Sequence, residues 1–382
     1  MKKKSTVNPY LTRIMQAVLV IGMVLALVIP DRKFSDVENR PLAQSAAFDK
    51  SSLIDGKTGQ DLNTWFSDQF PGRDQFFHLD YLFRKAFGQR EIKDVFLGHD
   101  ALLANPEQAN GDLVSQTLAS IDTFSQLNGL NNFVMVAPSA ATIQNQKLPK
   151  DAPVRDVNPT LDQIAGSLPN TNVVDLRPVM NEHKEDYIFY KTDHHWTTDG
   201  AGLAAQAMLG AMGIEMNPAD FQKMPVSDSF QGTLASKTGS PFLKDEINIA
   251  VANQNPRYYV TWADGTKTAS IYRRDALNTK DQYQVFLGAN QSMIRIDTDA
   301  QTTRTLLIFK DSYANSVIQY LLPYFSSITI VDPRYYYEDL ELALGSDLFT
   351  DCVFLYSYDT FTTIPSLKNV LDAWNASRMA AQ

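Results

Sequence analysis

The chain has 382 residues, with 34 Lys and Arg, 43 Asp and Glu, and a formal net charge of −9. At about 150 residues per domain, this length allows two domains or one elaborated domain. Hydrophobic residues make up 44%, which excludes disorder for most of the chain. The single cysteine, Cys352, excludes a disulfide framework and a cysteine-based zinc site. Residues 1–30 hold four of the cations and no acid, so the remainder carries −13, which argues against a nucleic-acid partner.

The amino-terminal segment predicts where the protein resides. Residues 14–30 form an apolar run of 17 residues that only Gln16 interrupts, at the short limit for a transmembrane helix. The cations precede it, so the positive-inside rule leaves the amino terminus in the cytoplasm and residues 31–382 outside. We therefore expect an uncleaved anchor in a bacterial cell membrane. A cleaved signal peptide, with Ala26-Leu27-Val28 before the cut, and a buried soluble helix are the alternatives.

The rest of the chain divides by composition. Residues 1–30 are the cytoplasmic tip and anchor, and residues 31–57 are polar and irregular and predict a tether. Residues 58–382 are expected to form one extracytoplasmic domain. Within it, residues at about 215–300 carry Gly, Asn, Asp and Thr punctuation and short β-rich runs, which predicts an insertion.

Helices and strands alternate along this domain. The predicted helices cover residues 62–70, 75–87, 112–127, 200–212 (with Thr198 or Asp199 as the cap), 313–320 and 367–379. The predicted strands cover residues 133–136, 173–174, 305–309, 328–331 and 352–356. This alternation predicts an α/β fold with a mostly parallel sheet.

Two stretches carry residues suited to catalysis. The first, residues 190–197, contains Asp193, His194, His195 and Trp196, and the second, residues 309–316, contains Ser312 directly after an apolar strand. A serine at such a strand-to-helix turn stands at the carboxyl edge of the sheet, where ligands bind in α/β proteins. Its own N–H lies at a helix start, where developing negative charge is favoured.

A base would complete this serine. His195 is the candidate, and Asp193 two residues earlier is placed to hold the far nitrogen of its ring. Other interpretations stay open. Ser312 could simply cap the following helix. His194 and His195 could ligate a metal with Asp193, although no HExxH pattern exists and the other three histidines are scattered.

At these residues the chain resembles a known family. Asp193-His194-His195-Trp196 spells the name of the DHHW proteins, which are similar to the SGNH-hydrolase-like proteins of alginate O-acetylation. The resemblance covers roughly residues 35–360. Further stretches that carry it are Glu38–Leu42, Phe70–Asp74, Asp94–Gly98, Phe230–Leu234 and Lys310–Tyr313.

The resemblance implies a three-layer α/β/α core in which the Asp/His loop precedes the serine strand. It implies that Ser312 is the nucleophile, His195 the base and Asp193 the group that orients it. It also implies work on acetyl esters of an extracellular polysaccharide, with a membrane-bound O-acyltransferase as a partner that passes acetyl groups outward. No cofactor and no metal are expected.

The sequence departs from the SGNH pattern in two places. Lys310 replaces the glycine of Gly-Asp-Ser, and there is no clear Gly-x-Asn-Asp block. Asn315 and Asn290 are therefore candidates for the second oxyanion donor. Lys310, Arg334 and Trp196 complete the candidate substrate contacts, although Arg334 also fits a surface ion pair and Trp196 a core position.

Three functions follow as hypotheses. The favoured one is an extracytoplasmic O-acetyltransferase, in which Ser312 takes an acetyl group and hands it to a sugar hydroxyl. An acetylesterase would use the same residues with water as acceptor. A non-catalytic polysaccharide-binding or scaffold protein would have kept only the fold. Because residues 31–382 are expected outside the cytoplasm, the transferase cannot rely on acetyl-CoA, and a donor protein is expected.

Overall fold

The computed structural model describes residues 9–44, 57–344 and 348–380. The chain separates into two compact units. The smaller comprises Met1–Gln89 and Ser236–Pro241, and the larger comprises Arg90–Ala235 and Phe242–Gln382. The boundaries given above for tip, tether and domain stay a prediction.

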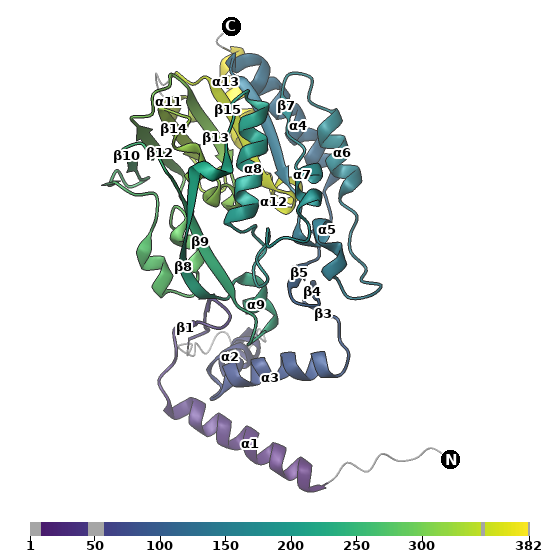
Figure 1. The fold of residues 1–382 in the computed structure, drawn as a ribbon. Helices are drawn as coiled ribbons and strands as arrows, with labels where there is room; N and C mark the ends of the chain where they lie inside the picture. The colour runs from purple at the N-terminus through teal and green to yellow at the C-terminus, as the bar shows by residue number, and fades with distance from the viewer. Residues whose placement is uncertain (1–8, 45–56, 345–347, 381–382) are drawn as a thin grey trace. The chain divides into compact units, whose positions relative to one another are not determined.

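The larger unit is built on an eight-stranded mixed sheet with the order β11-β10-β12-β14-β13-β15-β6-β7 (Figure 1). Five neighbouring strands are parallel: β14 (Ser327–Val331), β13 (Thr305–Lys310), β15 (Asp351–Ser357), β6 (Asn131–Ala137) and β7 (Asn172–Val173). The other three pair antiparallel at one edge: β12 (Met293–Thr298), β10 (Tyr258–Thr261) and β11 (Lys267–Thr268). All five predicted strands therefore form the parallel part of the sheet.

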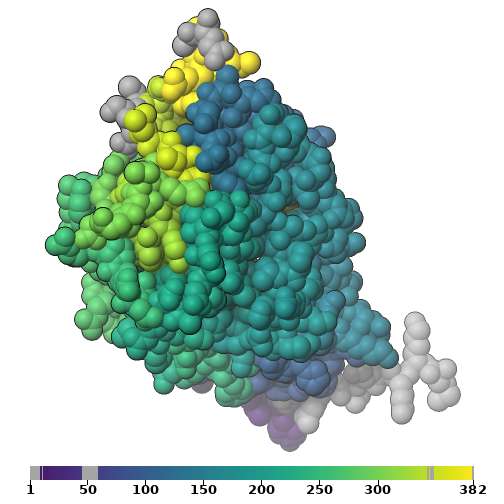
Figure 2. All heavy atoms as spheres, turned by 45° about the horizontal axis from the view of Figure 1, so that its top comes forward, coloured from purple at the N-terminus to yellow at the C-terminus, as the bar shows by residue number. Residues whose placement is uncertain are grey.

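Helices cover both faces of this sheet. Successive residues of a strand point to opposite faces, so Leu307 and Phe309 pack into one core cluster while Leu306 and Ile308 pack into the other. The first face holds α4 (Gly111–Asn128), α6 (Asn158–Gly166), α11 (Leu340–Leu344), α12 (Tyr358–Thr363) and α13 (Ser366–Ala380). The second holds α5 (Ala140–Ile143), α7 (Arg177–Glu182), α8 (Thr198–Ala211) and α10 (Ile318–Leu321). The expected three-layer α/β/α core is present, and α4 and α13 lie side by side at its surface (Figure 2).

The predicted insertion is β-rich. It begins with an antiparallel pair, β8 (Phe221–Phe230) and β9 (Asp245–Ala252), and continues into β10, β11 and β12. Because the last three strands join the central sheet, this part of the insertion shares the core of the larger unit, whereas Ser236–Pro241 belong to the smaller unit. The remaining small elements are β3 (Glu91–Ile92), β4 (Val95–Leu97), β5 (Leu102–Ala104) and the 3-10 helices η1 (Asn145–Lys147), η2 (Pro218–Asp220), η3 (Arg274–Asn278), η4 (Gln282–Val285) and η5 (Ser312–Ser316).

Two helix predictions need correction. Helix α8 is capped by Thr197, whose Oγ1 accepts the N–H of Gly200, and not by Thr198 or Asp199. The helix expected over residues 313–320 is split into η5 and the four-residue α10. In η5 the capping carboxylate of Asp311 accepts the N–H of Tyr313 at 2.9 Å, which favours a tight first turn.

The smaller unit contains α1 (Pro9–Val28), α2 (Lys57–Gln69), α3 (Arg73–Ala86) and a short hairpin of β1 (Phe34–Ser35) and β2 (Arg40–Pro41). Helix α9 (Thr233–Thr238) crosses the boundary between the units. Of the helices in the described residues, none is both long and apolar enough to cross a membrane. The expected transmembrane helix is therefore not supported.

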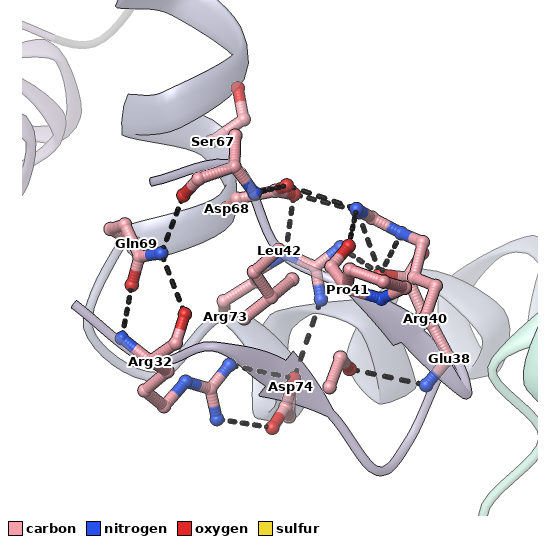
Figure 3. A network of polar contacts seen from close by, with 12 residues as sticks. Arg32, Glu38, Arg40, Pro41, Leu42, Ser67, Asp68, Gln69, Arg73 and Asp74 are labelled. Atoms are coloured by element: carbon pink, nitrogen blue, oxygen red, sulfur yellow. Dashed lines mark hydrogen bonds and ion pairs between the residues drawn. The ribbon is translucent and has the colours of Figure 1, made fainter. Parts of the chain in front are cut away.

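A network of ion pairs joins the hairpin to α2 and α3 (Figure 3). Both terminal nitrogens of the Arg40 guanidinium donate to the Asp68 carboxylate, at 2.9 and 2.6 Å. Arg73 binds Glu38 in the same cluster, and Arg32 binds Asp74 at 2.8 Å. These contacts bring together the two amino-terminal stretches that carry the family resemblance, residues 38–42 and 70–74. Part of the predicted tether is thus ordered against α2 and α3.

Candidate active site

A cavity of about 250 Å³ lies at the carboxyl ends of the parallel strands in the larger unit. This is the edge of an α/β sheet where ligands bind. Four of its lining side chains follow four different strands: Ser139 after β6, Ser312 after β13, Arg334 after β14 and Ser357 at the end of β15. Its remaining lining is Ala104, Glu107, Ala140, Asp193, His194, Leu234, Tyr313, Asp359 and Thr360.

Ser312 is held at this edge by its neighbour Asp311. One carboxylate oxygen of Asp311 caps η5, and the other accepts the N–H and the hydroxyl of Ser357 at 2.9 and 2.6 Å. The buried Asp311 thereby ties the turn after β13 to the turn after β15. Ser312 itself stays half-buried and lines the cavity.

The structure brings the three predicted residues Ser312, His195 and Asp193 together, and we call them the serine cluster. His195 Nε2 lies 2.8 Å from Ser312 Oγ, although the two residues are 117 positions apart in the chain. On its other side, His195 Nδ1 lies 2.6 Å from Asp193 Oδ1. Asp193 also accepts the backbone N–H of His195 at 3.0 Å, so one carboxylate oxygen fixes both the ring and the backbone of the histidine.

A second loop holds Asp193 from behind. Its other oxygen, Oδ2, accepts the N–H and the hydroxyl of Thr233 at 2.7 and 3.0 Å. The preceding Gly232 leaves no room for a side chain, because a Cβ there would lie 2.2 Å from Asp193 Oδ2. The stretch Phe230–Leu234, which the resemblance singled out, therefore supports the carboxylate of the serine cluster.

Tyr283 from η4 covers the face of the His195 ring. The two rings stack with centroids 3.8 Å apart and planes 10° from parallel. The Tyr283 hydroxyl donates to the carbonyl oxygen of Ser312 at 3.0 Å. One buried side chain thus positions both His195 and Ser312. No signal in the sequence distinguishes Tyr283 from the other tyrosines of the insertion.

The environment sets the charge states of the cluster. Burial lowers the pKa of His195 to about 4, together with the charge of His194 and against the opposing effect of Asp193. At neutral pH the imidazole is therefore uncharged, as a general base must be. Burial alone would raise the pKa of Asp193, but His194, His195 and its hydrogen bonds hold that pKa well below the usual range. The carboxylate stays ionised.

A second polar cluster surrounds Lys310, the last residue of β13, and we call it the lysine cluster. Its Nζ donates to Asn315 Oδ1 at 2.8 Å and to Asn290 Oδ1 at 2.9 Å, and lies 3.3 Å from Asp332 Oδ2. Arg334 binds the same Asp332 carboxylate at 2.9 and 2.7 Å. Burial lowers the pKa of Lys310, and Asp332 opposes that effect.

The candidate substrate contacts separate into two groups. The described lining of the cavity includes Arg334 but not Lys310, Asn290, Asn315 or Trp196. Trp196 is fully buried, and its Nε1 donates to the carbonyl of Tyr313 and the hydroxyl of Ser316, both at 3.0 Å. It lies in the core of the larger unit. Arg334 is partly exposed and faces the cavity, while its guanidinium is bound to Asp332.

The metal alternative involves the same histidines. Asp193, His194 and His195 offer ligand atoms that lie within 4.8 Å of one another. However, both Asp193 oxygens already accept hydrogen bonds, and His195 directs Nε2 at Ser312. His194 Nδ1 lies 2.7 Å from the hydroxyl of Thr233. His195 is bound to Ser312, and both His194 and Asp193 are bound to Thr233, so the candidate ligand atoms are already engaged by protein groups.

Several lining residues escaped prediction. Ser139 follows β6, Ser357 ends β15, Asp359 lies in the first turn of α12, and Glu107 lies in the loop before α4. Short polar residues after a buried strand were a usable signal for the first two, since parallel strands end at one edge. The contact from the Glu107 N–H to Asp359 Oδ1, at 2.8 Å, spans 252 residues and left no trace in the local sequence.

The fold and the site together define an SGNH-like α/β protein. Residues 95–287 match the family described as the SGNH hydrolase-like domain of the acetyltransferase AlgX, and the chain belongs to this family. The resemblance stated from the sequence is thus confirmed.

Individual relatives agree with this assignment. The chain is 27% identical over 180 residues to the probable alginate O-acetylase AlgJ of Pseudomonas putida, a match covering 43% of this chain and 46% of the relative. The chain therefore spans less than half the length of that curated relative. Among solved structures, a DHHW family protein from Eubacterium siraeum superposes with a TM-score of 0.63 at 21% identity, over 72% of this chain and 97% of the other. PatB1 of Bacillus cereus gives 0.61 at 21%, over 71% and 98%, and a second PatB1 structure carries a sulfonyl adduct. At these identities the structures show a shared fold.

Proposed function

We propose that the protein is an acyl-transfer enzyme that moves acetyl groups onto a polysaccharide through Ser312. The single observation that carries the proposal is the 2.8 Å distance between His195 Nε2 and the Oγ of Ser312, a residue that lines a cavity, with Asp193 on the far ring nitrogen. Family membership and the O-acetylase relative support the acetyl group as cargo.

The first step forms an acetyl-serine. Ser312 Oγ attacks the carbonyl carbon of an acetyl ester, and its proton passes to Nε2 of the neutral His195. Asp193 stabilises the imidazolium that results. When the carbonyl double bond re-forms, the donor alcohol leaves and takes the proton from His195. The second step repeats this sequence with a sugar hydroxyl as nucleophile, which yields the acetylated sugar and free Ser312.

Water in place of the sugar would make the protein an esterase. The half-buried Ser312 on an open cavity allows both acceptors to approach. A scaffold without chemistry would not need the imidazole within hydrogen-bond distance of the serine. We therefore rank transfer first, hydrolysis second and scaffolding third.

The location and the donor are part of the proposal. Four cations precede the apolar stretch in α1, which supports export of the body from the cytoplasm. Acetyl-CoA is not expected outside the cytoplasm, so a membrane-bound O-acyltransferase is the proposed donor partner. A carboxyl-terminal alkaline phosphatase fusion should be active in cells if export occurs. A fusion that is inactive while the protein is intact would contradict export.

The experiment that tests the mechanism compares wild type with Ser312→Ala on a chromogenic acetyl ester. We expect the change to lower turnover at least about a thousandfold, because the nucleophile is lost. Ser167→Ala, at an exposed serine at the end of α6, is the matched control and should retain full turnover. Acetylated oligosaccharide among the products would select transferase over esterase.

A covalent label gives a second readout. An aryl sulfonyl fluoride should modify Ser312, because its oxygen displaces fluoride from sulfur while the hydroxyl proton passes to His195. Mass spectrometry of the digested protein would locate the label. Equal labelling of wild type and Ser312→Ala would contradict the nucleophile assignment.

A further inference from the structure

The segment after β14 places two exposed tyrosines beside the cavity. Arg334 lines the cavity, and the ring of the next residue, Tyr335, lies 5.5 Å from its guanidinium carbon. Tyr337 folds back on the same turn, because its hydroxyl donates to the carbonyl of Arg334 at 3.0 Å. Tyr336 between them is buried and its hydroxyl donates to the Asp339 carbonyl, which anchors the segment.

Both tyrosine rings are open to solvent and are therefore available to a ligand. Tyr337 is 90% exposed and Tyr335 is 46% exposed. A tyrosine ring is a rigid amphipathic surface that orders at low entropic cost, which is why aromatic side chains recur at binding sites. The hydroxyl of Tyr337 is bound within its own turn, so what it offers to a ligand is the face of the ring.

The charges around the cavity restrict that ligand. Three carboxylates line it, from Glu107, Asp193 and Asp359. The one Lys or Arg in the described lining is Arg334, and its guanidinium is already paired with Asp332. His194 also lines the cavity, and its Nδ1 is bound to Thr233. The body as a whole is acidic. A chain of uronate sugars would meet like charge, whereas an uncharged sugar would not.

We propose that Tyr335 and Tyr337 form the acceptor subsite of this cavity, and that the subsite takes an uncharged sugar chain and disfavours a polyuronate. The sugar ring lies on the exposed tyrosine faces, and its next hydroxyl-bearing unit reaches Ser312. This proposal rests on the proposed function, since it names the acceptor class of the same site.

The test measures sugar binding separately from catalysis. The full chain carrying Ser312→Ala is titrated by calorimetry with tetrasaccharides of β-linked glucose, of N-acetylglucosamine and of mannuronate. We expect at least one uncharged tetrasaccharide to bind, and the mannuronate tetrasaccharide to bind at least about tenfold more weakly at low salt, a difference of about 1.4 kcal/mol. Adding Tyr337→Ala should weaken binding of the uncharged sugar about tenfold, or about 1.4 kcal/mol.

Two controls identify the cause. Tyr337→Phe keeps the ring and should keep the binding. Tyr259→Ala removes a tyrosine of similar exposure to Tyr335, 45%, from β10, which β12 separates from β14, and should change nothing. The melting temperature of each variant shows that it is folded.

The outcomes separate the two hypotheses. Tighter binding of mannuronate, no binding of the uncharged sugars at millimolar concentration, or binding unaffected by Tyr337→Ala would each overturn the acceptor subsite. Such a result would leave the proposed function standing if wild type still turns over the ester through Ser312. Binding that depends on Tyr337 in a protein without Ser312-dependent turnover would support the subsite and reject the mechanism.

Discussion

The serine cluster and the lysine cluster both include a residue at the end of β13, yet the surroundings of these two residues differ. Lys310 ends the strand and Ser312 stands two residues further on. The ammonium of Lys310 has three N–H donors. Three acceptor oxygens, all from protein side chains, lie 2.8 to 3.3 Å from it. Ser312 has its base on one side and the cavity on the other. The ammonium donors of Lys310 are all used by protein acceptors, which suits a structural role. The hydroxyl of Ser312 also borders the cavity, which leaves it accessible to a substrate.

Turnover should depend most strongly on the carboxylate of the serine cluster. Asp193→Asn keeps the size of the side chain but removes the charge that orients His195 and stabilises its cation. We expect ester turnover to fall about 10⁴-fold, as for other serine triads. Asp199→Asn, at an exposed aspartate paired with Lys223, is the control and should retain activity. Activity of Asp193→Asn within tenfold of wild type would contradict the mechanism. Inactivation of wild type by chelators would favour the metal alternative.

The support behind Asp193 gives the second effect. Gly232→Ala places a Cβ 2.2 Å from Asp193 Oδ2, so the carboxylate or its loop must move. We expect a loss of about 1–3 kcal/mol in the free energy of unfolding, together with reduced turnover. Gly210→Ala is the matched control, because a Cβ there meets nothing within 4 Å and alanine favours a helix. Unchanged turnover in Gly232→Ala would show that the position of Asp193 is not critical.

A substitution in the lysine cluster should lower stability more than it lowers turnover. Lys310→Met keeps most of the buried stem but removes one of the two cations beside Asp332. We expect the free energy of unfolding to fall by about 3 kcal/mol, measured in urea, while turnover falls far less than in Asp193→Asn. Lys223→Met, at an exposed pair, should cost at most about 1 kcal/mol. Full stability with turnover lost would place Lys310 in the chemistry and end the distinction between the clusters.

The pH dependence of wild-type turnover should show the least change over the neutral range. Because the pKa of His195 is lowered to about 4, turnover should be level through neutral pH and fall tenfold per unit below about 4. The unfolded chain binds this proton with a pKa of about 6.5. Stability from the buried neutral imidazole is therefore complete above about 6.5 and is lost as the pH falls toward 4. A kinetic midpoint near 6.5 would mean that burial does not perturb His195.

The ion-pair network of the smaller unit is a second polar cluster with a structural role. It joins residues 38–42 and 70–74, two stretches of the sequence that are further carriers of the family resemblance. In the structure Arg40 and Asp68 neutralise each other, and so do Arg73 and Glu38. A sequence motif with charged residues can therefore indicate either a structural ion pair or a catalytic group. The groups that its side chains contact in the structure distinguish these two roles.

The local structure and the set of reactive side chains could be read from the order of the residues alone. The spacing of apolar residues in α4, the buried runs of β6, β13 and β15, and the polar stretches at 193–196 and 310–312 are properties of adjacent residues. Periodicity reports such short-range order directly. The chemistry of the residues made His195 a candidate base for Ser312, and the family resemblance implied the same pairing, but the spacing did not show that the two side chains meet.

Which of these side chains meet depends on how the strands and helices pack in three dimensions. Strand order brings four strand ends to one edge, and packing stacks Tyr283 on His195 and places Thr233 against Asp193. It also turns Lys310 and Trp196 away from the cavity, although both lie within two residues of the serine cluster. These contacts join residues tens of positions apart, and their energies depend on burial and partners. A linear pattern does not encode either quantity.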